Sequence, residues 1–396
     1  MSVWLATGWV RARSGRWVAG CALPAVALLL FVLLFGPATS QPRAAAAQEG
    51  DVPVFAYYYI WFNPTSWQRA KIDYPLLGRY SSDEREVMRQ HIEWAKQVGI
   101  NGFIVSWKST ETLNRRLSRL AQVARAEHFK LAVIYQGLDF ERRPLPPERI
   151  AQDFDFFQKH YARDSVFRAF EKPVMIWSGT WKFTRQQVQS VTSSRRDRML
   201  ILASEKNAKG YGRIADLVDG DAYYWSSVNP STYPDYVGHL RQIEQVVHAH
   251  EGLWIAPAAP GFDARLVGGT SVVGRGDGDT LRREYDAAVS SSPDAVGLIS
   301  WNEFSENSHI EPSQRYGSRY LQVMADIRGA RAPRIDSVDS SEPATSAKGY
   351  GPVVLGAFII LLLAAGFVVL RRRPSRPPRR PPGRSERSER PLEDRG

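Results

Sequence analysis

Two glutamates three residues apart are the most chemically informative feature of the sequence. Glu303 and Glu306 follow a short apolar run over residues 294–299, which is typical of a buried strand. Trp301 and Asn302 lie beside them. Cleavage of a glycosidic bond needs such a pair of carboxyl groups, one to protonate the departing oxygen and one to act as a nucleophile or to activate one. The segment therefore predicts a site for acid–base chemistry on a sugar.

Apolar runs alternate with amphipathic stretches between residues 51 and 330, and this alternation predicts the elements that position the site. Strands are predicted at 53–60, 101–107, 131–137, 173–178, 198–204, 220–225, 253–258 and 295–301. Helices are predicted at 82–98, 111–128, 147–163, 183–193, 207–216, 234–251, 280–291 and near 312–328. Such a pattern over ~250 residues is typical of a (β/α)8 TIM barrel. A doubly wound open sheet is the alternative, but a glycine-rich phosphate motif does not follow the first strand.

In a barrel, chemistry is built where the strands end at their carboxyl side, so polar and aromatic residues are expected just after each strand. Aromatic planes suit the C–H face of a sugar, and its hydroxyls need donors and acceptors. We predict a polysaccharide or glycan substrate that contacts Tyr58, Tyr59, Trp61, Asp73, Trp107, Gln136, Asp139, Trp177, Glu205, Tyr224, Trp225, Phe262, Asp263, Trp301 and Asn302. The alternative for any one aromatic residue is that it fills the barrel.

The net charge of +11 is concentrated outside the predicted barrel and does not indicate a nucleic-acid partner. Residues 371–396 hold ten arginines against four acidic residues, and residues 1–50 hold four against one. The single cysteine, Cys21, lies in the N-terminal apolar segment, so the predicted barrel has neither a disulfide nor a thiolate metal site. Histidine and acidic residues show no metal-ligand spacing, and neither a cofactor nor a metal is predicted.

The ends of the chain predict attachment to a membrane. Residues 1–47 combine arginines, an apolar run and an alanine-rich site, which is typical of a signal peptide, with an uncleaved N-terminal anchor as the alternative. A Ser- and Pro-containing stalk over 331–350 leads to an uncharged run over 351–370, long enough to be a single transmembrane helix. The basic tail over 371–396 is then expected to be disordered and cytoplasmic. This arrangement predicts a single-pass cell-membrane protein with its large domain outside.

The closing motif, residues 302–311, resembles the conserved stretch of glycoside hydrolase families 71 and 99, which reads approximately Asn-Glu-Trp-His-Glu-Gly-Thr-Gln-Ile-Glu in family 99. Here it reads Asn-Glu-Phe-Ser-Glu-Asn-Ser-His-Ile-Glu. Further similar blocks follow in the expected order at 57–62, 77–82, 91–95, 99–107 and 260–263. The resemblance covers about residues 55 to 325. It implies a barrel glycosidase that acts on α-linked sugars.

The resemblance also implies roles for the two glutamates. In family 99, the endo-α-mannosidase family, Glu306 would be the general acid/base. Glu303 would deprotonate the sugar's own 2-hydroxyl, which then attacks the anomeric carbon. Phe304-Ser305 and residues 307–309 depart from family 99 toward the family 71 α-1,3-glucanases. On a glucan, Glu303 would instead activate water.

Three other interpretations remain open from the sequence. Glu303 and Glu306 are also suited to cap the last helix, because the helix dipole favours acids at an N-terminus. Glu205, which follows the fifth predicted strand, is the rival catalytic carboxylate. A barrel that binds glycans without cleaving them is the alternative from another functional class.

Overall fold

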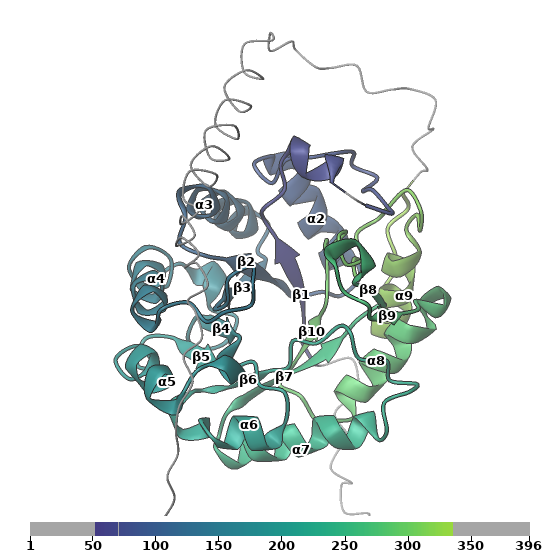
Figure 1. Ribbon diagram of the computed structural model, residues 1–396. Helices are drawn as coiled ribbons and strands as arrows, with labels where there is room; N and C mark the ends of the chain where they lie inside the picture. The colour runs from purple at the N-terminus through teal and green to yellow at the C-terminus, as the bar shows by residue number, and fades with distance from the viewer. Residues whose placement is uncertain (1–51, 70, 336–396) are drawn as a thin grey trace, which may run out of the picture. The chain divides into compact units, whose positions relative to one another are not determined.

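A computed structural model describes residues 52–69 and 71–335. Its main strands are β1 (Val54–Tyr59), β2 (Gly102–Trp107), β3 (Lys130–Gln136), β4 (Val174–Ser178), β5 (Leu200–Leu202), β6 (Gly220–Ala222), β7 (Leu253–Ala258) and β10 (Ala295–Leu298). All pairings between them are parallel, in the order β5-β4-β3-β2-β1-β10-β7-β6. The terminal strands of this sheet meet through a parallel bridge between Ala203 and Asp221. The sheet therefore closes almost completely into a barrel (Figure 1).

The predicted barrel is confirmed, and each of the eight predicted strands overlaps an observed one. The last residues predicted for β5 and β6 lie outside the ladder, because the chain there turns into loops above the barrel. A short antiparallel pair, β8 (Phe262–Asp263) and β9 (Val272–Val273), was not predicted. It lies in the long connection after β7.

Helices follow the strands and cover the outside of the barrel (Figure 1). They are α2 (Arg85–Gln97), α3 (Glu111–Ala126), α4 (Pro147–His160), α5 (Arg185–Thr192), α6 (Ala208–Gly212), α7 (Tyr236–Ala249), α8 (Asp279–Val289) and α9 (Arg319–Arg328). Gly99 ends the turn after α2 at a φ of 77°, a conformation that glycine adopts without strain. The last helix begins at Arg319 and not near residue 312. Glu303 and Glu306 therefore lie in the loop before it and do not cap it, which rules out the capping interpretation.

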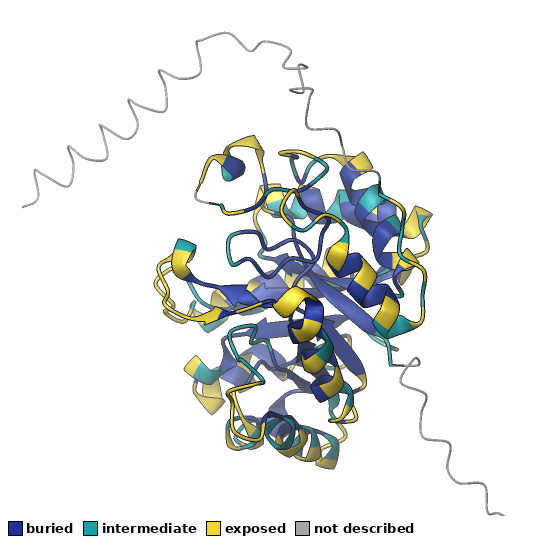
Figure 2. Cartoon of the chain, turned by 90° about the vertical axis from the view of Figure 1, so that its right-hand side faces the viewer, coloured by how far each residue is buried: buried dark blue, intermediate teal, exposed yellow. Residues whose placement is uncertain are grey.

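The core has two layers because successive side chains on a strand point to opposite faces. On β1, Phe55 and Tyr57 belong to the cluster that fills the barrel. Val54, Ala56 and Tyr58 belong to the larger cluster between the strands and the helices. Figure 2 shows the buried strands inside and the exposed residues on the outer helix faces and loops. This alternation decides which residues near the strand ends can reach a site.

The N-terminal segment 1–47, the transmembrane segment 351–370, the tail 371–396 and most of the stalk 331–350 lie outside the described residues. Within residues 52–69 and 71–335, every helix is too short or too polar to cross a membrane.

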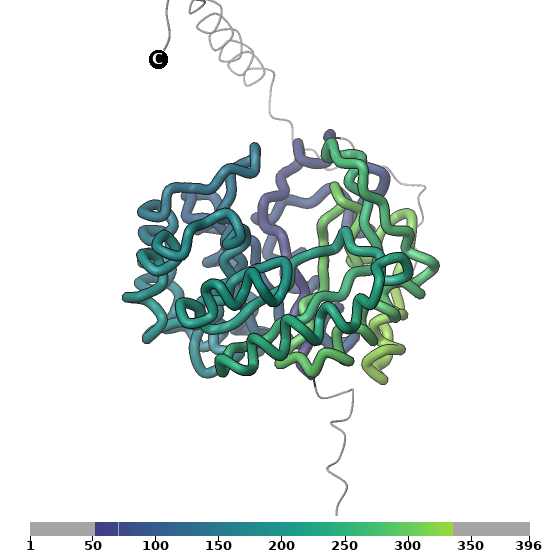
Figure 3. The backbone as a smooth tube through the Cα atoms, turned by 60° about the horizontal axis from the view of Figure 1, so that its bottom comes forward, coloured from purple at the N-terminus to yellow at the C-terminus, as the bar shows by residue number. Residues whose placement is uncertain are grey.

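Two segments far apart in the sequence join above β1 and β10. Pro75 and Ser313 form an antiparallel bridge, and the Leu76 amide donates to the Pro312 carbonyl at 2.9 Å. In Figure 3 the purple segment after β1 runs close to the light green segment that leads to α9. The loop after β1 is thus fastened to the loop that carries the two glutamates.

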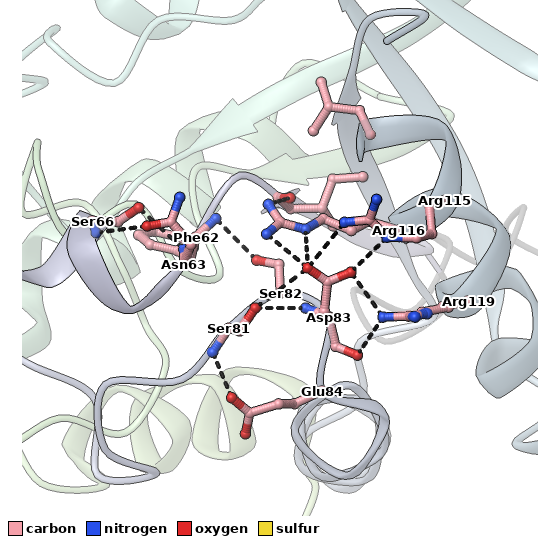
Figure 4. A network of polar contacts seen from close by, with 12 residues as sticks. Phe62, Asn63, Ser66, Ser81, Ser82, Asp83, Glu84, Arg115, Arg116 and Arg119 are labelled. Carbon is pink, nitrogen blue, oxygen red and sulfur yellow. Dashed lines mark hydrogen bonds and ion pairs between the residues drawn. The ribbon is translucent and has the colours of Figure 1, made fainter. Parts of the chain in front are cut away.

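An ionic cluster around Asp83 fixes the chain directly after β1 (Figure 4). The Asp83 carboxylate is bound by Arg115, Arg116 and Arg119 of α3 at 2.8–3.1 Å. Arg116, which is 4% exposed, also donates to the Ile60 carbonyl at 2.9 Å. The Phe62 amide donates to the Ser82 hydroxyl at 3.1 Å. The residues on both sides of Trp61 are therefore held from α3 and from the segment before α2.

We expect Asp83→Ala to lower the free energy of unfolding by about 2–3 kcal/mol, because it leaves the buried Arg116 charge without a carboxylate. Arg115→Ala is the matched control. Its side chain is 44% exposed, so its loss should cost much less than the loss of Asp83. Urea denaturation of both variants measures the difference. Equal losses would show that the cluster acts only as surface charge.

Candidate active site

The carboxyl ends of the strands surround a cleft of about 500 Å³. It contains both closing glutamates. Among the predicted substrate contacts, the cleft is lined by Tyr59, Trp61, Trp107, Gln136, Asp139, Tyr224, Trp225 and Phe262. These residues come from the ends of β1, β2, β3 and β6 and from the connection after β7. The topology therefore brings them together with Glu303 and Glu306 from the loop after β10.

The loop that carries the glutamates folds back on itself. The Ser300 amide donates to the Ser308 carbonyl at 2.8 Å, and the Ser308 amide donates to the Glu303 carbonyl at 3.2 Å. The Ser300 hydroxyl accepts the Glu303 amide at 2.8 Å. Because the loop's own polar groups bond one another, both carboxyl groups are held in place without a helix.

Glu303 is the more buried of the two glutamates, at 5% exposure. Burial raises the pKa of its carboxyl group, and two neighbours oppose this shift. The Ser305 amide donates to its Oε1 at 2.8 Å, and the charge of Lys71 favours the carboxylate. Lys71 in turn donates to the Ser305 hydroxyl at 2.7 Å. Residues from the loop after β1 thus support the anionic form of Glu303.

Glu306 lies at the cleft in a different electrostatic setting. Burial, and then the nearby charge of Glu303, raise the pKa of its carboxyl group to about 7, while Arg142 acts in the opposite direction. Within residues 52–69 and 71–335, no backbone amide donates to the Glu306 carboxyl group as Ser305 does to Glu303. The backbone carbonyl of Glu306 accepts the Asp263 amide at 2.7 Å. At neutral pH Glu306 is therefore the member of the pair suited to carry a proton.

Two tyrosines complete this end of the cleft. The hydroxyls of Tyr59 and Tyr224 are hydrogen-bonded to each other. Burial raises the pKa of both phenols, and the charges of Glu303 and Glu306 add to the shift. Both side chains therefore remain neutral and present O–H groups near the two carboxyl groups.

Seven predicted contacts do not line the cleft. Tyr58 and Trp301 lie against His91 on the helix side of the sheet, and the Tyr58 hydroxyl bonds His91 Nδ1 at 3.0 Å. Trp177 packs against Phe183. Strand alternation explains these placements, because the neighbour of a residue that faces the cleft points toward the helices. The positions of Tyr58, Trp177 and Trp301 therefore do not agree with their predicted contact with the substrate.

The other four have partners within the protein. Asn302 bonds the backbone of Tyr59 at both its amide and its carbonyl. Asp73 is hydrogen-bonded to His309, and ion pairs join Glu205 to Arg213 and Asp263 to Arg265. Glu205, the rival carboxylate, lies 2% exposed behind the cleft, so its position favours the Glu303 and Glu306 pair.

Residues missing from the predicted set also line the cleft, namely Ser106, Lys108, Leu113, Leu138, Phe140, Arg142, Ser178, Trp181, Ser226 and Ser227. Lys108 and Ser178 directly follow predicted contacts at strand ends, so the same signal could have identified them. Phe140, Arg142 and Trp181 lie deeper in loops whose paths the strand pattern does not predict. Among residues 52–69 and 71–335, no group of three or more His, Cys, Asp or Glu side chains is placed to hold a metal ion.

Comparisons with known proteins agree with this geometry. The model of glycosyl hydrolase family 99 matches residues 66–324. The fold is similar to the family 99 endo-α-mannosidase of Bacteroides thetaiotaomicron in complex with bis-tris propane, with a TM-score of 0.61 and 19% identity over 70% of this chain and 96% of that chain. A second structure, described as a glycoside hydrolase-like protein, has a TM-score of 0.55 and 16% identity over 70% and 94% of the two chains. Among curated proteins nothing matches. Because the family model spans well over half of the sequence, the chain belongs to glycosyl hydrolase family 99 and is a glycoside hydrolase.

Proposed function

We propose that the protein is an endo-acting hydrolase of α-mannan-type glycans, with Glu306 as general acid/base and Glu303 as the base that acts on the sugar's 2-hydroxyl. The observation that carries this proposal is the unequal setting of two carboxyl groups in one cleft. Lys71 and the Ser305 amide favour the anion at Glu303, and the Glu303 charge favours the protonated form at Glu306. The endo-α-mannosidase with a similar fold supports the choice of sugar.

The proposed reaction has two steps at the anomeric carbon. In the first, Glu306 gives its proton to the glycosidic oxygen as the bond from C1 to that oxygen breaks. Glu303 takes the proton of the 2-hydroxyl, whose oxygen forms the new bond to C1. In the second step Glu306 removes a proton from water, which attacks C1 as the bond from C1 to O2 breaks, and Glu303 returns its proton to O2. Two displacements preserve the α configuration.

The substrate requirement follows from this chemistry. The 2-oxygen attacks C1 from the side opposite the leaving group, and an α-mannoside places its 2-hydroxyl there while an α-glucoside does not. The purified full chain should therefore release shorter oligosaccharides from α-mannan and leave α-1,3-glucan intact. Glu306→Gln is the matched control for contaminating activity.

The other outcomes assign a different function. Release of oligosaccharides from α-1,3-glucan would contradict the route through the 2-hydroxyl and make Glu303 a base that activates water. Saturable binding of these polymers without any product would favour a glycan-binding barrel.

We expect Lys71→Met to move the acidic limb of the pH dependence of kcat/KM to higher pH. Loss of the ammonium raises the pKa of Glu303, so a higher pH is needed to form its carboxylate. Lys71→Arg, which keeps the positive charge, should keep the limb near its original position. A uniform loss of rate at every pH, without a shift, would mean that Lys71 only shapes the loop.

We also propose that the barrel is displayed outside the cell, with the N-terminal segment 1–47 directing export and residues 351–370 crossing the membrane. Support comes from the uncharged length of 351–370 and from the three arginines at 371–373. Deletion of 351–396 should move the protein from the membrane fraction to the soluble fraction. Protease treatment of intact cells should degrade the barrel, and protection of the barrel would contradict this orientation.

A further inference from the structure

A lysine outside the cleft lining lies against two tryptophans that line one wall of the cleft. Trp181 and Trp225 line the cleft from the loops after β4 and β6, with ring centroids 5.2 Å apart and planes inclined by 47°. The Lys206 ammonium lies 5.2 Å from the centre of the Trp181 ring and 5.1 Å from that of Trp225. Cation–π attraction therefore fixes a positive charge beside two indole rings at the cleft.

Two other cations, Lys108 and Arg142, line the cleft itself, on the loops after β2 and β3. Lys108 donates to the Leu138 carbonyl at 3.0 Å and forms no ion pair within 4.0 Å, although the charges of Asp139 and Asp153 act on it from farther away. Arg142 lies in a tight turn that the Asp139 amide closes by donating to the Arg143 carbonyl at 2.9 Å. The carboxylate of Asp139 is already bound by Arg143 at 2.7 Å. The acidic residue of this wall is thus neutralised, and Arg142 is not.

The three cations form one arc of the rim. Lys108, Arg142 and Lys206 follow β2, β3 and β5, and these strands lie together on one side of β1 in the sheet order. Among residues 52–69 and 71–335, no carboxylate lies within 4.0 Å of any of the three charged groups. Serine hydroxyls at 178, 226 and 227 line the same part of the cleft. The two glutamates come from another loop, the one after β10, and line the same cleft.

A neutral sugar needs aromatic planes and hydroxyl partners, but it gains little from three cations that have no ion-pair partner. An anion gains from each of them, because charge-assisted hydrogen bonds are stronger than neutral ones. We propose that this arc is a subsite for an anionic group, a phosphate or a carboxylate, on a glycan whose neighbouring ring stacks on Trp181 or Trp225. This proposal rests on the proposed glycosidase function and specifies its substrate class.

The test compares three α-mannose oligosaccharides of equal length with the full chain: one with a phosphate monoester, one with a terminal glucuronate, and one neutral. At low salt, kcat/KM should be about tenfold higher for at least one anionic chain than for the neutral chain. The ratio should fall toward one in 1 M salt, where screening acts over ~3 Å. The phosphate and glucuronate arms identify which anion the subsite prefers.

Substitutions of two of the three cations test whether they cause the preference for an anionic chain. Lys206→Met and Arg142→Met should each reduce the ratio of anionic to neutral kcat/KM several-fold, and Lys206→Arg should retain it. Lys159→Met is the control with the same change of charge, because Lys159 lies in the last turn of α4, away from the cleft lining. Equal reductions in the Lys159 and Lys206 variants would contradict the subsite and indicate only the protein's overall charge.

Binding measurements distinguish a wrong subsite proposal from a wrong proposal of glycosidase function. Calorimetry of the three chains with the Glu306→Gln protein reports affinity without turnover. Tighter binding of an anionic chain without hydrolysis by the unmodified protein would support the subsite and overturn the glycosidase proposal. Hydrolysis of all three chains with equal kcat/KM and equal affinity would overturn the subsite alone.

Discussion

Glu306→Gln is expected to lower kcat/KM for α-mannan cleavage by about 10²–10⁴, the usual contribution of a positioned general acid. Glutamine keeps the size of the side chain but has no acidic proton for the leaving oxygen. The loss should depend on the leaving group. A mannoside with a dinitrophenolate leaving group needs little protonation, so its cleavage to the intermediate should fall less than tenfold.

The pH dependence gives an independent check of the same role. The pKa of Glu306 is raised to about 7, so the protonated acid is lost as the pH rises through that value. Activity of the unmodified protein on α-mannan should therefore decline above about pH 7, and the residual activity of Glu306→Gln should lack this decline. Assays across the pH range with both proteins measure the difference.

Glu303→Gln serves as the contrast. Its proposed role is to generate the attacking oxygen, which both leaving groups require, so its loss should be large on the natural and on the activated substrate. If Glu306→Gln loses the same factor on both substrates, it is not the acid. If Glu303→Gln is rescued by the activated leaving group, the two roles are reversed.

The sequence was sufficient to predict the eight-stranded barrel and the position of the two glutamates just after its last strand, because both depend on patterns that survive without coordinates. Buried parallel strands read as apolar runs, and the carboxyl ends of such strands share one edge. The predicted pair Glu303 and Glu306 lies in the cleft for this reason. At a strand end, a shift of one residue decides which of two neighbouring side chains faces the cleft, and the sequence pattern does not fix this shift. Tyr59 therefore lines the cleft while Tyr58 faces His91.

Residues in long loops could not be predicted from periodicity. Lys71 reaches Ser305 only because the loop after β1 is bridged to the segment before α9. Trp181 and Lys206 meet across two different loops, and a sequence pattern does not encode that contact. Asp73 and Asp263 were reasonable candidates as polar loop residues. Asp73, however, is hydrogen-bonded to His309 of the loop after β10, and Asp263 is paired with Arg265 of its own loop.

Asn302→Ala is expected to lower the free energy of unfolding by about 3–5 kcal/mol, since it leaves buried backbone groups without partners. Asn302 is fully buried, and its Oδ1 accepts the Tyr59 amide at 2.8 Å. Its Nδ2 donates to the Tyr59 carbonyl at 3.0 Å and to the Tyr80 hydroxyl at 3.3 Å. The side chain thus continues the seam between β1 and β10 beyond the last backbone pair.

The network beyond Asn302 makes the loss cooperative. The Tyr80 hydroxyl donates to Glu311 Oε2 at 2.8 Å, and Glu311 Oε1 lies 3.0 Å from His91 Nε2. Both Glu311 and His91 are buried, so a shift of Tyr80 weakens the geometry of this buried hydrogen-bonded pair at a further cost. Asn302 also connects two residues that line the cleft, because it bonds Tyr59 and directly precedes Glu303. Activity should therefore fall along with stability.

Thermal unfolding distinguishes this structural role from the substrate contact predicted for Asn302. The Tm should fall by about 6–20 °C, at the ~2–4 °C per kcal/mol typical of a domain of this size. Asn302→Asp keeps an acceptor for the Tyr59 amide but has no donor for its carbonyl, so it should fall between alanine and the unmodified protein. Gln136→Ala removes an amide that lines the cleft and should change KM with little effect on Tm. An Asn302→Ala protein with an unchanged Tm and a reduced kcat/KM would restore the interpretation as a substrate contact, because only loss of a group that touches the sugar reduces turnover without weakening the fold.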